Sequence, residues 1–83
     1  MKIQIKYFAS IREALGVGSE SLDTDAPTVA ALRDVLIARG GAAAEALGRN
    51  RHVRMALNQT LVDESALLSE GCELAFFPPV TGG

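Results

Sequence analysis

The stretch from Leu74 to Gly83 reads LAFFPPVTGG and decides how the last strand of the fold ends. An apolar run leads into two consecutive prolines, which lack backbone N–H groups and hold φ near about −65°, so pairing in a sheet is predicted to stop there. The two final glycines have no Cβ, which lets other groups approach the backbone from every side. We therefore predict a domain over residues 1–79 and a flexible C-terminal tail over residues 80–83.

The free carboxylate of Gly83 is the predicted functional group, because a projecting tail without side chains can carry it into a narrow site on another protein. The alternative is a frayed end, since termini are commonly disordered. At average glycine usage, a Gly-Gly end arises by chance in roughly one chain in two hundred. Its position directly after a strand and two prolines in a small domain favours the functional interpretation.

The first residues alternate in the way typical of a strand with one polar face. Met1, Ile3, Ile5 and Tyr7 fall on one face, and Lys2, Gln4, Lys6 and Phe8 fall on the other. Phe8 is thus an aromatic residue in phase with lysines. The following Ser10–Glu13 segment has the form of a capping box, which predicts a short helical turn ending at Gly16.

The middle of the chain predicts a weaker strand and then the main helix. Residues 19–25 are expected to form a hairpin with the first strand. Thr28 is the expected N-cap of a helix that ends at Gly40–Gly41 and buries one apolar stripe. The predicted stripe consists of Val29, Leu32, Val35 and Leu36. Residues 42–47 predict a second short helix.

The last third of the chain predicts three strands. Residues 53–57 alternate, residues 58–59 resemble a turn, and residues 60–62 form a brief strand. The loop at residues 63–71 is expected to bury Leu67 and Leu68. In the final strand, Cys72 is in phase with Leu74 and Phe76, so we interpret it as a core residue rather than a nucleophile.

This order of elements is that of an α+β protein with the β-grasp, or ubiquitin-like, fold: one mixed sheet of four to five strands crossed by one main helix. In that fold the first and last strands are parallel neighbours. Phe8 and Phe77, both out of phase with the core, should then lie side by side on the exposed face. With Leu61 they form a predicted partner-binding patch.

Length and composition limit the alternatives. Eighty-three residues with 48% hydrophobic side chains suit a single small domain. No stretch is long and apolar enough to span a membrane, so the cytoplasm is the expected location. One cysteine and one histidine make a metal site improbable. A net charge of −2 argues against broad nucleic-acid binding, although a basic run lies on a loop or strand edge that faces either solvent or an acidic partner. That run comprises Arg49, Arg51, His52 and Arg54.

The segment from Ala75 to Gly83 resembles the C-terminal signature of the molybdopterin synthase small subunit family, often called MoaD. The likeness covers nearly the whole chain, and Cys72 departs from an acidic residue common among relatives. It extends in the family's order to Tyr7–Glu13, to Pro27–Val29 with Ala31–Arg33, and to Asn58–Val62.

The resemblance implies a sulfur carrier that is not catalytic alone and that forms a heterotetramer with the synthase large subunit (MoaE-like). A ubiquitin-activating-like adenylyltransferase (MoeB-like) would use ATP in trans to adenylate Gly83, and sulfur would replace AMP to give a thiocarboxylate. The tail, Val80, Thr81, Gly82 and Gly83, would enter the large subunit and donate sulfur to cyclic pyranopterin monophosphate. The chain itself is expected to bind no cofactor.

Three other interpretations remain open at this point. The chain could serve as a related carrier for thiazole or tRNA thiolation, or as a ubiquitin-like modifier joined to lysines. The remaining case is a binding domain with an accidental diglycine. A gain of sulfur, as against attachment to other proteins, separates the carriers from the modifier.

Overall fold

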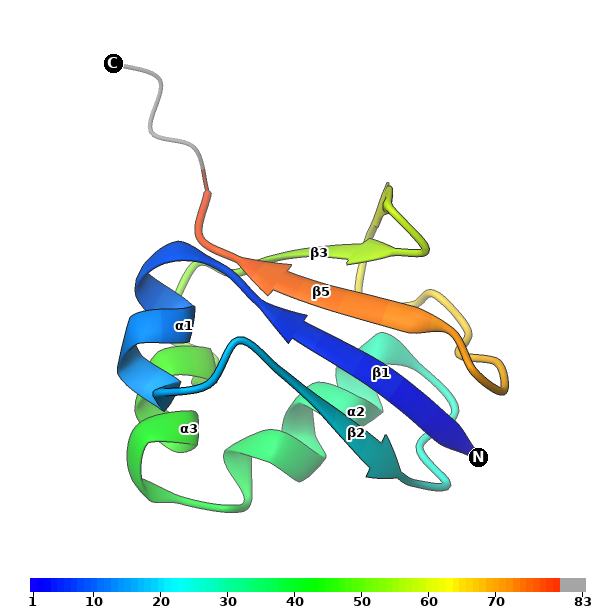
Figure 1. Cartoon of the computed structure of the whole chain (residues 1–83), viewed down its shortest axis with the longest axis horizontal. Coiled ribbons are helices and arrows are strands. Elements are labelled where there is room, and N and C mark those ends of the chain that lie inside the picture. Colours follow the sequence, from blue (N-terminus) through cyan, green and yellow to red (C-terminus); the bar gives the residue numbers. More distant parts are fainter. Residues whose placement is uncertain (80–83) are drawn as a thin grey trace.

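The computed structural model describes residues 1–79, which form five strands and three helices (Figure 1). In chain order they are β1 (Lys2–Tyr7), α1 (Ala9–Leu15), β2 (Ser19–Asp23), α2 (Val29–Ile37), α3 (Gly41–Leu47), β3 (Arg54–Leu57), β4 (Thr60–Val62) and β5 (Glu73–Phe77). Among these described residues, no helix is long and apolar enough to cross a membrane.

The five strands form one mixed sheet in the order β2-β1-β5-β3-β4. β1 and β5 are parallel neighbours at its centre, and the other three pairings are antiparallel. Parallel pairing of the first and last strands requires a crossover, which the helices provide. The arrangement confirms the predicted α+β class and the ubiquitin-like β-grasp fold.

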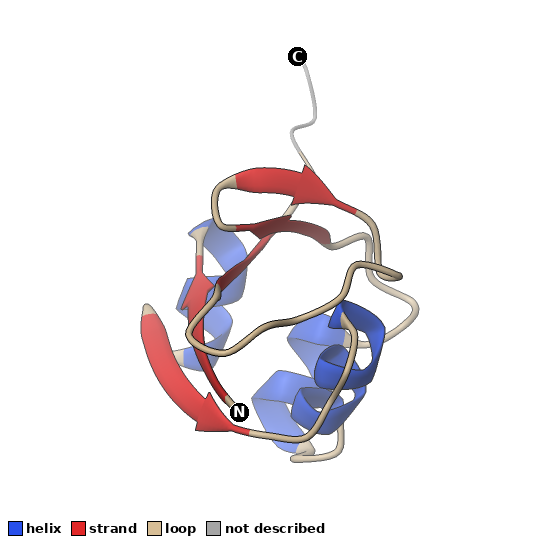
Figure 2. Cartoon of the chain, turned by 90° about the vertical axis from the view of Figure 1, so that its right-hand side faces the viewer, coloured by secondary structure: helices blue, strands red, loops and turns tan. Residues whose placement is uncertain are grey.

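The core lies between one face of the sheet and the helices, which gather on that side (Figure 2). Ile3, Ile5 and Tyr7 of β1 point into it and alternate with exposed residues. The rings of Tyr7 and Phe76 stack with their centroids 6.2 Å apart. Full burial of such side chains stabilises the fold by about 1.5–3 kcal/mol each. Cys72 is buried with them, which confirms its assignment to the core.

Most local signals for turns and helix ends agree with the structure, although α2 ends at Ile37 and not at Gly40–Gly41 as predicted. The Thr28 hydroxyl accepts a hydrogen bond from the backbone N–H of Ala31 at 3.2 Å, so Thr28 caps α2 as predicted. Gly16 ends α1 in the left-handed conformation, with φ of 77°. Asn58 and Gln59 both have positive φ and form the turn between β3 and β4.

The capping box at Ser10 was wrong. Helix α1 begins at Ala9, and its N-cap is Phe8, which makes no side-chain cap. The carbonyl of Phe8 accepts hydrogen bonds from the backbone N–H groups of Ile11 and Arg12 at 3.2 and 3.3 Å. Ser10 therefore lies inside the first turn, where its hydroxyl cannot serve as the cap.

Two predicted core positions were also wrong. Val35 is exposed, because at 3.6 residues per turn it points away from the stripe of Val29 and Leu36, and Arg33 occupies that stripe instead. Leu67 is 73% exposed. The chain around it pairs with the start of α2 in an extended conformation, so alternate side chains face inward and Leu68, not Leu67, is buried.

Candidate functional site

The site begins on the face of the sheet opposite the helices, where the register of β1 and β5 brings Phe8 next to Phe77. Lys6 pairs with Ala75 and Tyr7 with Phe76, and the backbone N–H of Phe8 donates to the carbonyl of Phe76 at 3.1 Å. Phe8 keeps an extended backbone, so the alternation of β1 continues through it. Its side chain lies on the outward face and is 47% exposed.

A sharp change of direction follows Phe8. Ala9 adopts φ of 51°, a left-handed conformation that residues with a Cβ seldom take. The chain passes at this point from the sheet into α1. Phe8, the residue between β1 and α1, thus lies outside the core.

The same face carries Leu61, although it belongs to the edge strand β4. β5 pairs with β3 so that Ala75 lies opposite Ala56, and β3 pairs with β4 so that Ala56 lies opposite Leu61. The two alanines were not anticipated as part of the site, although their strand phase could have placed them there. Their small side chains connect Leu61, which is 60% exposed, with the aromatic residues.

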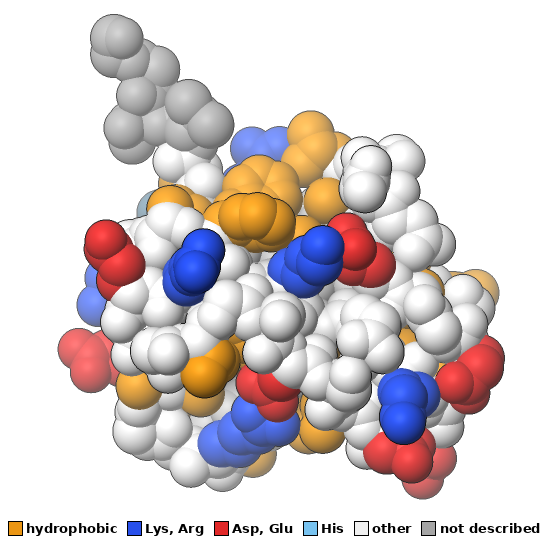
Figure 3. All heavy atoms as spheres, in the orientation of Figure 1, with side chains coloured by type: hydrophobic (Ala, Val, Ile, Leu, Met, Phe, Trp, Pro, Cys, Tyr) orange, Lys and Arg blue, Asp and Glu red, His pale blue; other side chains and the backbone are white. Residues whose placement is uncertain are grey.

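We call these five residues, Phe8, Ala56, Leu61, Ala75 and Phe77, the apolar patch. Figure 3 shows hydrophobic side chains gathered on this face with Lys and Arg side chains beside them. On its border Lys6 Nζ lies 3.3 Å from a carboxylate oxygen of Glu73. The structure thus brings together the three residues predicted to bind a partner; their role in binding stays a prediction.

β5 ends at Phe77, directly before Pro78 and Pro79, as the missing backbone N–H groups predict. The four residues predicted to form the reactive tail, Val80, Thr81, Gly82 and Gly83, lie outside the described residues. What the structure places is the point from which they start, at the border of the apolar patch.

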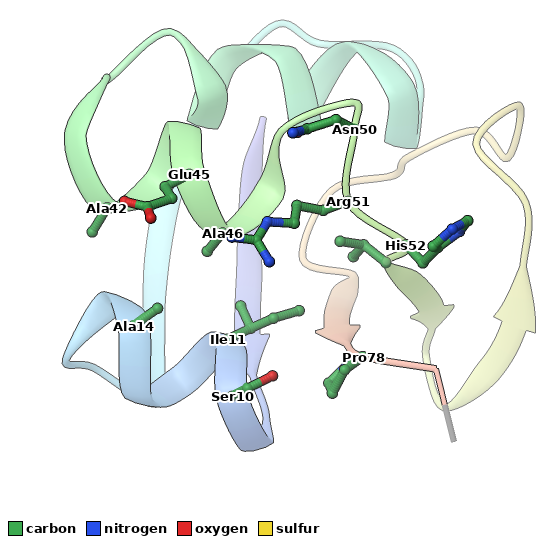
Figure 4. Close-up of a pocket in the computed structure, with 11 residues that line it drawn as sticks. Ser10, Ile11, Ala14, Ala42, Glu45, Ala46, Asn50, Arg51, His52 and Pro78 are labelled. Carbon is green, nitrogen blue, oxygen red and sulfur yellow. The ribbon is translucent and has the colours of Figure 1, made fainter. Parts of the chain in front are cut away.

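A groove of about 570 Å³ lies on the helix side of the same point (Figure 4). α1 and α3 form its two walls, Pro78 lies at one end, and the side chain of Arg51 extends across it toward α3. Two of the residues that line it, Ile11 and Val53, belong to the hydrophobic core. His52 also lines the groove and is exposed.

Arg33 was missed by the sequence interpretation, and it organises the loop beside the groove. It is only 4% exposed and donates hydrogen bonds to the carbonyls of Leu47, Gly48 and Arg51 at 2.7, 2.9 and 3.2 Å. Its Nη1 lies 2.6 Å from a carboxylate oxygen of Glu64. A fork of donors can satisfy this many acceptors at once, which explains why an arginine can be buried here.

Glu64 joins two arginines, since Arg49 pairs with both Glu64 and Asp34. Partial burial acts to raise the pKa of Glu64, but the hydrogen bonds from Arg49 and Arg33 outweigh it and hold that pKa below its ordinary value of 4.5. We call these residues the arginine cluster: Arg33, Asp34, Arg49 and Glu64. Within residues 1–79, no group of three histidine, cysteine or acidic side chains is placed to hold a metal ion.

The fold and the site together define a ubiquitin-like β-grasp domain that presents an apolar patch beside the end of its last strand. The profile of the ThiS family matches residues 5–83, so the chain belongs to the ThiS family. It is 43% identical over 81 residues to the molybdopterin synthase sulfur carrier subunit of Escherichia coli (strain K12), covering 98% of this chain and 99% of that protein.

Solved structures agree with this membership. SAMP1 of Haloferax volcanii, the small archaeal modifier protein 1, is 28% identical and superposes with a TM-score of 0.78 over 100% of both chains. A chain in the complex of subunits 1 and 2 of the molybdopterin-converting factor from Helicobacter pylori 26695 is 26% identical, with a TM-score of 0.72 over 100% of both chains.

Proposed function

We propose that this chain is the sulfur-carrier subunit of molybdopterin synthase. The observation that carries the proposal is the 43% identity to the Escherichia coli subunit of that name over nearly the full length of both proteins. The apolar patch supports the proposal. An exposed apolar surface beside the start of a reactive tail suits a carrier that must bind its partner before it donates sulfur. The proposed location is the cytoplasm, where ATP for activation is available.

The proposed reaction uses the carboxylate of Gly83. A carboxylate is a poor acyl donor because oxide is a poor leaving group. A MoeB-like adenylyltransferase would let a Gly83 oxygen attack the α-phosphorus of ATP, with pyrophosphate leaving. A sulfide equivalent would then attack the carbonyl carbon and release AMP, which leaves a thiocarboxylate. ATP is thus used by the activating enzyme and not by this chain.

The proposed partner in the second step is a MoaE-like large subunit. The Helicobacter pylori structure contains subunits 1 and 2 of its converting factor together, which supports a two-subunit assembly here. Phe8, Leu61 and Phe77 would dock on the large subunit while Val80–Gly83 enter its active site. Two successive sulfur transfers would convert cyclic pyranopterin monophosphate to the dithiolene of molybdopterin.

The decisive experiment incubates the purified chain with the activating enzyme, ATP and a sulfide source and follows its mass. The expected result is a gain equal to the exchange of one oxygen for sulfur, followed by its loss when the large subunit and the pterin are added. A chain lacking Gly83 is the matched control and should gain no sulfur. A truncated chain that still supported molybdopterin synthesis would refute the assignment of Gly83.

A second candidate is a protein modifier, which the similarity to the small archaeal modifier protein favours. All ubiquitin-like carriers activate the same terminal carboxylate, but a modifier passes it to an amine. Mass spectrometry of proteins from the native cell separates the two functions. Gly83 found in an amide bond to lysine side chains would favour the modifier.

A further inference from the structure

The arginines divide into two groups according to the ion pairs they make within the described residues. Arg33, Arg39 and Arg49 pair with carboxylates of the fold itself. Three others make no ion pair with any residue in the range 1–79: Arg12, Arg51 and Arg54. Of these, Arg12 lies over Gly18. The other two belong to the basic run noted in the sequence.

Arg51 and Arg54 stand on either side of the point where β5 ends. In the β3–β5 ladder Arg54 is opposite Phe77, so its exposed side chain lies on the face of the apolar patch. Arg51 lies in the groove with Pro78 (Figure 4). We call these two residues the basic rim.

The rim is fixed in place by the arginine cluster. The carbonyl of Arg51 accepts a hydrogen bond from the buried guanidinium of Arg33, which also holds the carbonyls of Leu47 and Gly48. The loop before β3 is therefore tied to α2 and α3. The side chain of Arg51 therefore projects from a loop that is held in place, which lowers the entropy lost when a partner binds.

The charge of the rim is opposite to that of the whole chain. The net charge is −2 and the sequence pI is about 5.2, yet Arg51 and Arg54, which flank the end of β5 on its two faces, make no ion pair among residues 1–79. Two exposed cations beside an apolar centre form the common plan of a protein interface, with a hydrophobic middle and a charged border. Complementary charges at such a border accelerate encounter and exclude wrong partners more than they tighten the complex.

Resting on the proposed function, we infer that Arg51 and Arg54 are specificity-determining residues that receive carboxylates of the large subunit of molybdopterin synthase. The partner surface that fits has an apolar centre for Phe77 and acidic side chains on both sides of the channel that admits the tail. The contact thus extends from the sheet face around the end of β5 and into the groove.

The test measures association and dissociation rates with the large subunit of the same organism, at low and at high salt. The variants are Arg54→Glu and Arg51→Glu. The matched control is Lys2→Glu, which changes the net charge equally at an exposed position without an ion pair among residues 1–79. Lys2 is at the far end of β1, about 20 Å from Phe8 along the strand, which exceeds the Debye length of about 10 Å at 0.1 M salt, the lower of the two concentrations used.

Each rim variant should slow association about 10-fold at low salt, with a smaller effect at high salt, while Lys2→Glu changes it by less than about 2-fold. Unfolding curves should match the unmodified chain, which excludes loss of folding as the cause. If Phe77→Ala weakens binding while both rim variants keep the normal rate and salt dependence, the inference is wrong and the proposed function stands. If the unmodified chain does not bind the large subunit at all, both are wrong.

Discussion

Arg33 and Phe8 occupy places opposite to those that hydropathy alone would assign. The arginine is 4% exposed at the centre of the arginine cluster, whereas the phenylalanine is 47% exposed in the apolar patch. Arg33 can be buried because three carbonyls and a carboxylate accept its hydrogen bonds. Phe8 is outside because the alternation of β1 places it in phase with Lys6.

The two regions also differ in what they connect. The arginine cluster joins α2, the end of α3, the loop before β3 and the segment after β4, so its contacts are internal to the fold. The apolar patch has neighbours within the sheet, but among residues 1–79 no helix or strand lies above it (Figure 2). A polar group with all its partners inside stabilises the domain, while an apolar surface without a cover is available to another protein.

The largest expected effect follows from removing Arg33. Arg33→Ala leaves the Leu47, Gly48 and Arg51 carbonyls without their donor, and an unsatisfied buried polar group costs about 1–3 kcal/mol, so the free energy of unfolding should fall by about 3 kcal/mol. Urea denaturation measures it. The control is Phe8→Ala, which removes an aromatic ring from an exposed site and should lower the free energy of unfolding by less than about 1 kcal/mol. Equal losses of stability in Arg33→Ala and Phe8→Ala would contradict the conclusion that the arginine cluster stabilises the fold more than the apolar patch does.

The next largest effect is on binding rather than folding. Phe77→Ala should weaken the complex with the large subunit by about 2 kcal/mol, because a ring at the centre of an interface is a typical anchor. Its melting temperature should change little. Calorimetric titration and thermal unfolding of the same variant provide both values. A large loss of stability with unchanged affinity would place Phe77 in the core and contradict the proposed role of the patch.

Most of the fold could be predicted because its signals are local. The alternation of β1, the Thr28 cap, Gly16 and the Asn58–Gln59 turn each depend on a few adjacent residues. Phe8 and Phe77 could be paired from strand phase together with the parallel contact of the first and last strands.

The errors come from contacts that are distant in the sequence. Burial of Arg33 depends on carbonyls 14 to 18 residues away and on Glu64, 31 residues away, and no local pattern contains them. Leu67 was wrongly predicted to be buried, because its segment pairs with the start of α2 and hydropathy does not indicate that contact. Alternation finds the faces of a strand, but it does not find which side chains satisfy a buried charge.

Lowering the pH should reduce the stability that the arginine cluster provides, but not the contribution of Phe8 and Phe77. The pKa of Glu64 is lowered in the folded state, so its contribution to stability is complete above the ordinary value of 4.5 and is lost as the pH falls below it. Glu64→Gln should therefore flatten the acid side of the stability curve, whereas Phe8→Ala should leave its slope unchanged. Glu20 will retain part of the slope, because the hydrogen bond from Arg39 lowers its pKa also. Urea denaturation across the acid range measures these slopes, and an unaltered slope in Glu64→Gln would show that the cluster does not set the acid sensitivity.

The smallest expected effect concerns the N-caps of two helices, one beside the arginine cluster and one beside the apolar patch. α2, next to the arginine cluster, is capped by the hydroxyl of Thr28, whereas α1 begins at the apolar patch with Phe8 as an N-cap that offers no side-chain acceptor. Thr28→Ala should lower the free energy of unfolding by about 1 kcal/mol, because the N–H of Ala31 loses its acceptor.

Ser10→Ala is the matched substitution, since it removes a hydroxyl from the other helix start at the position where the sequence wrongly predicted a cap. Ser10 lies within α1, where alanine is the better helix former by roughly 0.5 kcal/mol, so this variant should be neutral or slightly more stable. Paired denaturation curves at one pH measure the difference between the two variants. An equal loss of stability in both variants would mean that Ser10 caps α1 in solution. The helix beside the apolar patch would then begin with a side-chain cap, as the helix of the arginine cluster does.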